Sequence, residues 1–241
     1  MYEDGPLMRR FADLHLINPG QGLSRMAERA ALLGYDLIGL TLKGRPEDPG
    51  SLKREFLERG VDVALRIDLS PRSRQELLSL LGRYRPIFEV VSVNCANKAI
   101  CDAASRDGRV DLIFFGEGPI GPRVRLPKEA SSALEVNIRD LIAADGARDI
   151  GRALRKVRRD LEVAFENGME VVASSGAEDP DMMRGPREIA SLLKFLGMGS
   201  EEALASVSET PISLVRSNRM KLRGEVVCDG VRVLGGSGGD G

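Results

Sequence analysis

The chain has 241 residues, of which 42% are hydrophobic, and a formal net charge of −1 at pH 7. A chain of this length can bury a large core as one domain, and its balanced charge argues against a free-standing nucleic-acid-binding domain, since such domains are usually basic. No stretch approaches the roughly 18 apolar residues of a membrane span and the N-terminus lacks a signal-peptide pattern, so we expect a cytoplasmic protein with no membrane partner.

Short apolar segments predict seven strands, at residues 11–17, 37–42, 61–69, 88–93, 110–115, 133–136 and 170–174. Helical patterns alternate with them, at residues 23–33, 51–59, 73–84, 97–106 and 149–167. Such alternation predicts a mainly parallel sheet. At this length and strand number we expect an α/β fold of the TIM-like barrel type rather than an open doubly wound sheet. The sequence shows no clear eighth strand.

The C-terminal part of the chain is mostly helical in pattern. Pro186 begins a helix that extends to residue 196, a second helix follows at residues 200–207, and Thr210 is expected to cap a last one at 211–222. Residues 224–241 are rich in glycine, and we expect disorder beyond about residue 234. We therefore predict one barrel domain over residues 1–223 and a tail.

The segment at residues 88–115 predicts strand, helix and strand with basic side chains at both ends of the helix. Lys98 lies in the first helical turn, where the macrodipole disfavours a cation by up to about 1 kcal/mol, so a phosphate contact is one explanation for it. The spacing of Lys98, Asp102 and Arg106 is also typical of an ion-pair ladder. At the other end of the helix, Arg106 and Arg109 can pair with nearby aspartates or contact a second anionic group.

The predicted helix at residues 149–167 is strongly amphipathic. Its apolar stripe consists of Ile150, Leu154, Val157, Leu161 and Phe165, and a second stripe, about 200° away, of Arg148, Arg152, Arg155 and Arg159. Residues 148–159 hold six cations against one carboxylate. This density indicates a polyanion or an acidic protein face as the partner, although a solvated helix face explains it as well.

Polar residues also lie near the ends of the predicted strands: Asp13, His15, Lys43, Arg66, Asp68, Asn94, Glu135, Asn137, Ser174 and Ser175. Asp13 and His15 would suit a metal, but His15 is the only histidine, whereas a multinuclear hydrolase site usually assembles several. Acid–base catalysis by Asp68 and Glu135 stays open, although no spacing selects them. The serines lack the context of a hydrolase nucleophile.

Several sequence blocks follow one another as in a known family. They are Asp13-Leu14, ALLGYDLIGL from Ala31, Lys98 after a VSV segment, LEVN from Leu134, the arginine-rich helix, SSGA from Ser174 and RGPREIASLLKFLGM from Arg184. Over residues 11–222 the chain resembles ribonuclease P protein component 3, the archaeal counterpart of the eukaryal thirty-kilodalton subunit. That family resembles PHP-type metal hydrolases in its barrel. Asp13 and His15 are similar to the start of their metal motif, but Ile17 follows Leu16 where they have a second histidine, and the later histidines are missing.

The resemblance implies a non-catalytic subunit of the RNA-based endonuclease that removes the 5′ leader of precursor tRNA. The RNA would carry the catalysis with Mg²⁺, and the protein would hold no cofactor and no metal, with Asp13 and His15 as vestigial metal ligands. The implied partners are ribonuclease P RNA, ribonuclease P protein component 2, the other ribonuclease P proteins and, indirectly, precursor tRNA. The expected RNA-binding residues are Lys98, Arg106, Arg109, Lys128, Arg148, Arg152, Arg155, Arg159 and Arg187.

Other interpretations of the sequence remain. One is a PHP-like metal-dependent phosphoesterase, which the histidine count disfavours. The other is a TIM-barrel enzyme acting on a small phosphorylated substrate with Lys98, Arg109 and a backbone nest near Gly176, which requires a deep, closed pocket. The low aromatic content, 4%, fits recognition of RNA shape and backbone better than stacking on bases.

Overall fold

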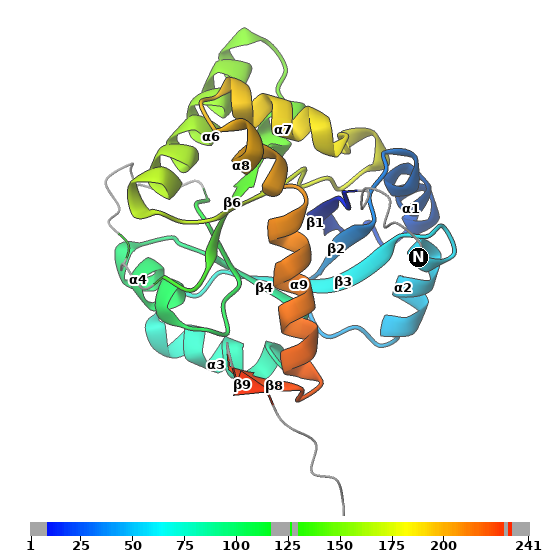
Figure 1. Cartoon of the computed structure of the whole chain (residues 1–241), viewed down its shortest axis with the longest axis vertical. Coiled ribbons are helices and arrows are strands. Elements are labelled where there is room, and N and C mark those ends of the chain that lie inside the picture. The colour runs from blue at the N-terminus through cyan, green and yellow to red at the C-terminus, as the bar shows by residue number, and fades with distance from the viewer. Residues whose placement is uncertain (1–8, 117–125, 127–129, 229–230, 233–241) are drawn as a thin grey trace, which may run out of the picture.

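Seven parallel strands pair in chain order around a nearly closed barrel (Figure 1). The computed structural model describes residues 9–116, 126, 130–228 and 231–232. The strands are β1 (Ala12–Ile17), β2 (Leu37–Leu42), β3 (Asp62–Leu69), β4 (Val90–Asn94), β5 (Leu112–Phe114), β6 (Ala133–Asn137) and β7 (Val171–Ser174). All seven predicted strands are therefore confirmed, as is the TIM-like α/β class.

Helices surround the strands on the outside. They are α1 (Leu23–Leu32), α2 (Pro49–Leu57), α3 (Arg74–Tyr84), α4 (Lys98–Arg106), α5 (Arg139–Ile142), α6 (Ala147–Asn167), α7 (Pro186–Phe195), α8 (Ser200–Ala205) and α9 (Glu209–Leu222). A 3₁₀ turn, η1 (Pro180–Met182), precedes α7, and β8 (Val226–Cys228) and β9 (Val231–Arg232) form a short antiparallel hairpin. The sequence had not indicated α5, η1 or this hairpin, and the tail beyond residue 234 lies outside the described residues.

The starts of α2, α3 and α4 are fixed by side chains that accept hydrogen bonds from backbone N–H groups of the first helical turn. Asp48, Ser73 and Asn97 play this part. Thr210, in contrast, lies within α9, so the prediction that it caps this helix is wrong. The N-cap is Ser208, because α9 begins almost directly after α8.

The barrel interior is apolar at the amino ends of the strands. Its lining residues are Ala12, Leu14, Leu37, Ala64, Val90, Leu112, Ala133 and Val172, and Val215 of α9 packs among them. Figure 1 looks onto this end of the barrel, with α9 lying across it. Arg219 of α9 fixes the helix there by binding Asp62 and Glu89 next to the amino ends of β3 and β4. The opposite end, where the strands finish, is left for the βα loops.

The seam between β1 and β7 takes the place of an eighth strand. At its amino end, residues 206–208 run between the two strands, where the carbonyl of Val207 accepts from Ala12 N–H at 2.9 Å and that of Ser206 from Ala173 N–H at 2.9 Å. At the other end, Ile17 N–H donates to the Ala177 carbonyl at 2.8 Å. Irregular chain thus closes the barrel.

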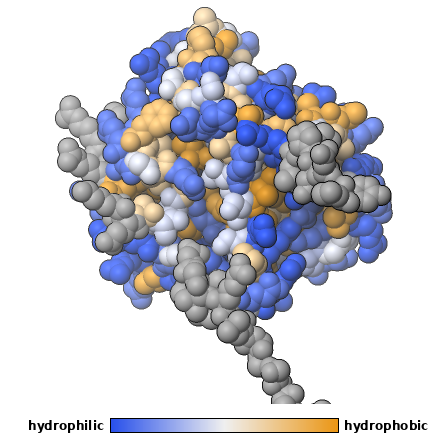
Figure 2. All heavy atoms as spheres, in the orientation of Figure 1, coloured by the Kyte–Doolittle hydropathy of each residue, from blue (hydrophilic) through white to orange (hydrophobic). Residues whose placement is uncertain are grey.

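The outer surface on the α9 side mixes hydrophilic and apolar side chains. The apolar ones gather in several separate patches rather than one continuous face (Figure 2). Among the residues that the structure describes, no helix combines the length and the apolar character that crossing a bilayer requires.

Candidate functional site

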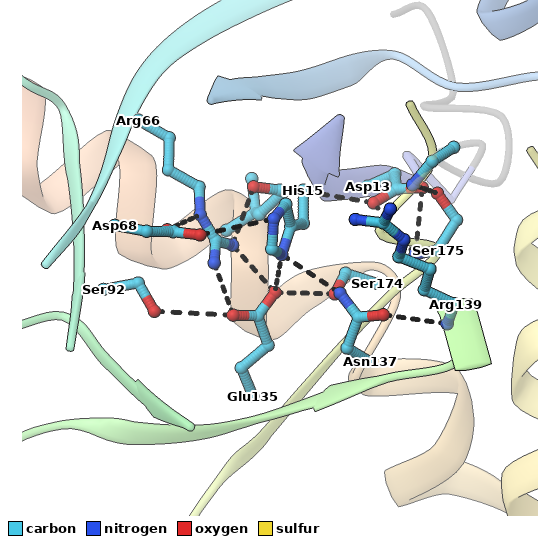
Figure 3. Close-up of polar contacts among 12 residues, drawn as sticks. Asp13, His15, Arg66, Asp68, Ser92, Glu135, Asn137, Arg139, Ser174 and Ser175 are labelled. Carbon is cyan, nitrogen blue, oxygen red and sulfur yellow. Dashed lines mark hydrogen bonds and ion pairs between the residues drawn. The ribbon is translucent and has the colours of Figure 1, made fainter. Parts of the chain in front are cut away.

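A buried guanidinium occupies the centre of the barrel above the apolar layer. Arg66 of β3 has no solvent-exposed surface. Its Nε donates to Asp68 Oδ1 at 2.7 Å, and Nη1 donates to Glu135 Oε1 at 2.8 Å and to the Leu14 carbonyl at 3.0 Å. The second terminal nitrogen donates to the other oxygen of Glu135, so the contact with this carboxylate is bidentate (Figure 3).

His15 of β1 lies beside this guanidinium, between the same two carboxylates. Its Nδ1 is 2.9 Å from Glu135 Oε1, and its Nε2 is 3.3 Å from Asp68 Oδ2. The amide nitrogen of Asn137 lies 3.1 Å from Nδ1, and the Ser174 hydroxyl donates to Glu135 at 2.6 Å. β1, β3, β6 and β7 together supply this cluster.

The charges of the cluster support one another. Burial alone would raise the pKa of Glu135, but Arg66 and His15 outweigh it and hold that pKa well below its ordinary value. Burial acts in the opposite direction on Arg66, whose pKa is nonetheless raised because Asp68 and Glu135 face it. Glu135 therefore stays ionised and bound to the guanidinium.

Two glycines make this arrangement possible. A Cβ at Gly39 of β2 would lie 2.2 Å from the Leu14 carbonyl oxygen, which is the oxygen that Arg66 binds. A Cβ at Gly176 would lie 2.4 Å from the amide of Asn137, and its φ of 65° is in the left-handed region. Glycine inside a strand, as at Gly39, often marks such a close backbone approach, so this residue is a sequence signal for the site.

Asp13 lies apart from His15's imidazole ring, in the seam. Its carboxylate accepts from the hydroxyl and the N–H of Ser175 and from the backbone N–H of His15. Burial raises its pKa, although these hydrogen bonds lower it in part. Asp13 thus links β1 to the end of β7.

The residues present do not fit a catalytic metal centre. The carboxylates of Asp68 and Glu135 are held by Arg66, and Asp13 is turned to Ser175. Within the described part of the chain, no three His, Cys, Asp or Glu side chains are grouped so that they could hold one metal ion. Acid–base catalysis is equally unsupported, because the two carboxylates neutralise the same cation.

A hollow of about 820 Å³ opens above the cluster, between the loops that follow β1 and β2. His15 and Asp68 form part of its floor, and Lys43 lies in its wall. Lys98 and Arg109 do not line it. They lie at opposite ends of α4, so the phosphate site in which they would act together with Gly176 is not formed.

The predicted cations of α4 separate into free and paired groups. Lys98 and Arg106 are exposed and form no ion pair within the described residues, so the ladder through Asp102 does not exist. Arg109 instead binds Asp107, with contacts of 2.9 and 2.7 Å. The two free cations lie at opposite ends of the helix.

On α6 the buried face differs from the predicted stripe. Ala153, Val157, Asp160, Leu161, Val163 and Ala164 are buried. Ile150 and Phe165 are 41% and 50% exposed, because the face that α6 buries is rotated about the helix axis from the predicted stripe, so that Ala164 is buried next to the exposed Phe165. The helix therefore buries a carboxylate, Asp160, that the pattern had not placed in the core.

The basic stripe of α6 is also divided. Arg148 and Arg155 are exposed and form no ion pair within the described part of the chain, whereas Arg152 pairs with Asp149 at 3.0 Å. Arg159 is half-buried and binds the buried Asp160 at 2.9 Å. Arg148 and Arg155 are therefore available to a partner, Arg152 is shared with Asp149, and Arg159 has a structural role.

Two other predicted RNA-binding residues lie away from α4 and α6 along the sequence. The guanidinium of Arg187 lies over the ring of Phe11, with its carbon 5.3 Å from the ring centroid. Lys128 lies outside the described residues. Of the predicted residues that the structure describes, Arg152, Arg155 and Arg159 line one hollow of about 730 Å³ beside α6, whereas Lys98, Arg106, Arg109 and Arg187 lie on other parts of the chain.

The family model for RNase P subunit p30 matches residues 10–223 of the chain. The chain is 30% identical over 234 residues to Ribonuclease P protein component 3 of Methanococcoides burtonii, and the match covers 94% of this chain and 95% of that protein. The protein of the same description in Methanothermobacter thermautotrophicus is 23% identical over 240 residues, with 95% and 97% covered.

Solved structures with the same fold include one chain of an archaeal ribonuclease P determined by cryo-EM with mature tRNA. It matches with a TM-score of 0.72 at 18% identity, covering 94% of this chain and 99% of that one. An amidohydrolase crystal structure matches with a TM-score of 0.54 at 14% identity, covering 87% and 74%. At these identities the two likenesses show the fold alone.

Proposed function

The chain belongs to the RNase P subunit p30 family, and from that premise we propose that it serves ribonuclease P as a protein subunit that binds and stabilises the RNA subunit. The observation that carries the proposal is the match to this family over residues 10–223, because it spans the whole barrel. The site agrees with it: where the barrel could hold a metal centre, Arg66 neutralises the carboxylates.

We further propose that the RNA subunit carries the catalysis and that Mg²⁺ is bound there rather than by this chain. The reaction is hydrolysis of one phosphodiester bond, which removes the 5′ leader of precursor tRNA. Cations of the protein support it by neutralising phosphates of the RNA and releasing their counterions. Lys98, Arg106, Arg148 and Arg155 are suited to this, because no carboxylate of the described residues holds them.

Ribonuclease P protein component 2 is the protein partner that we propose, together with the other ribonuclease P proteins. A subunit that meets RNA on one face and protein on another can be nearly neutral overall, as this chain is with a net charge of −1. Precursor tRNA would be contacted through the assembly.

Reconstitution tests the proposal. Cleavage of precursor tRNA is measured for the RNA subunit with all protein subunits, with this chain left out, and with this chain alone. We expect activity to fall when the chain is left out, most clearly at low Mg²⁺, and no cleavage by the chain alone. Cleavage by the chain alone that disappears in a His15→Ala variant would contradict the proposal and favour a metal phosphoesterase.

A further inference from the structure

One half of the barrel rim carries cations that nothing in the fold neutralises. They lie in the loops after β1 to β4 or in the first turns of the helices that follow, and all are exposed: Arg25, Lys43, Arg45, Arg72, Arg74 and Lys98. None of these six side chains forms an ion pair within the described residues. We call them the basic crescent.

The carboxylates of the same loops do not cancel this charge. Three are present: Glu47, Asp48 and Glu76. Asp48 accepts the backbone N–H of Ser51, and Glu76 accepts that of Arg72. The crescent therefore keeps an excess of positive charge that faces solvent.

The backbone adds to this charge. Because β1 to β4 are parallel and neighbouring, α1 to α4 all begin at the same rim and direct the positive ends of their dipoles to it. α1, α2 and α4 have no acidic residue in the first turn. Arg74 and Lys98 even occupy the first position of α3 and α4, where a cation costs helix stability.

Several cations elsewhere on the barrel, in contrast, form ion pairs with carboxylates. On the rim beyond β6, Arg139 binds Glu178 at 2.7 Å and Lys156 binds Asp140 at 2.6 Å. At the amino ends of the strands, Arg85 binds the buried Asp111, and Arg219 is held by two carboxylates, those of Asp62 and Glu89. These pairs neutralise part of the positive charge there, although Arg106, Arg148 and Arg155 are also unpaired within the described residues. The crescent differs in that neighbouring loops and first helical turns on one rim supply all six of its cations.

We propose that the basic crescent is a docking surface for the sugar–phosphate backbone of the RNA subunit. This inference rests on the proposed function and assigns it a face of the barrel. Neighbouring helices are about 8–10 Å apart, so the crescent presents its cations along an arc rather than around one point. An arc suits successive phosphates of an RNA strand, which is also the recognition of shape and backbone expected for structured RNA.

The test compares two triple variants of the full-length chain. The crescent variant carries Lys43→Gln, Arg45→Gln and Arg72→Gln. The control carries Arg54→Gln, Arg83→Gln and Arg216→Gln, which remove the same charge from exposed side chains without an ion pair in the described residues. Arg54 and Arg83 lie in the last turns of α2 and α3, away from the rim.

Affinity for ribonuclease P RNA is measured at several salt concentrations. Each lost phosphate contact lowers the slope of log K against log salt by roughly 0.7–0.9. We expect the crescent variant to lose about two units of slope and the control to keep the wild-type slope. Equal slopes for both variants would overturn the proposal. So would a crescent variant with wild-type RNA binding that fails only when the other protein subunits are added, because the crescent would then face protein.

The wild-type chain separates this failure from failure of the proposed function. If wild type binds ribonuclease P RNA no better than an unrelated RNA of equal length and gives no activation, the function itself is wrong. If wild type binds and activates but the crescent variant does the same with an unchanged slope, only the crescent is wrong.

Discussion

Arg66 is the residue on which the centre of the barrel depends. It is a fully buried cation shared by Glu135 and Asp68, and its removal leaves both carboxylates without their counterion. Such uncompensated buried charge is more costly than the loss of an exposed ion pair. The sequence placed Arg66, Asp68 and Glu135 at strand ends, but it gave no sign that the three would meet around one guanidinium.

Replacing Arg66 by methionine is therefore expected to destabilise the protein by about 3–5 kcal/mol. Lys98→Met, which removes an exposed cation, is the matched control and should change the free energy of unfolding by no more than about 0.5 kcal/mol. Urea unfolding followed by circular dichroism measures both. A loss below about 1 kcal/mol in Arg66→Met would mean that the cluster is not a structural unit.

Stability should also depend on the ionisation of Glu135. Burial would raise its pKa, but Arg66 and His15 hold it well below the ordinary value of 4.5, so the unfolded chain binds a proton here at a higher pH than the native chain. The stabilisation from this carboxylate is thus complete above about pH 4.5 and is lost as the pH falls towards the native pKa, by up to about 1.4 kcal/mol per pH unit.

Glu135→Gln tests this dependence. The variant is expected to be less stable than wild type at pH 7, and the difference in the free energy of unfolding should narrow as the pH falls below about 4.5. Urea titrations between pH 7 and pH 3 give this difference. If it stays constant over that range, the carboxylate is not held ionised by its neighbours.

Among the elements, α6 shows what sequence periodicity can and cannot predict. Its existence and length followed from its apolar spacing, but its rotation about its own axis did not. The buried face includes Ala153 and Asp160, whereas Ile150 and Phe165 of the predicted stripe are exposed. The same limit applies to its arginines. A helical wheel does not show that Arg159 forms an ion pair with the buried Asp160, whereas Arg155 forms no ion pair within the described residues.

This division predicts separate effects for two sets of substitutions. Arg159→Ala leaves the buried Asp160 without its guanidinium and should cost about 1–3 kcal/mol of stability. Arg152→Ala with Arg155→Ala should leave stability within about 1 kcal/mol of wild type and lower activation of the RNA. Thermal unfolding and reconstituted cleavage measure the two effects. If the double variant activates the RNA as wild type does, the helix face is merely solvated.

For the whole molecule, the strands and the fold class could be predicted because each strand and helix has a strong local pattern. The closure could not, because the seam is made by irregular chain that carries no periodic signal. Ser206 and Val207 pair with β7 and β1 through backbone atoms alone, which any sequence could supply. The polar cluster around Arg66 could not be predicted for a similar reason. Its members come from β1, β3, β6 and β7, and only the closed barrel brings them together.

The seam also has a consequence for synthesis of the chain on the ribosome. β1 is the first strand to be made, but the groups that bind its free side, Ser175, Ala177 and Val207, come after all the other barrel strands. Until then β1 is an open edge strand, and unpaired edges attract other chains. The free edge of β1 in the nascent chain is therefore covered only after residues up to Val207 have emerged from the ribosome.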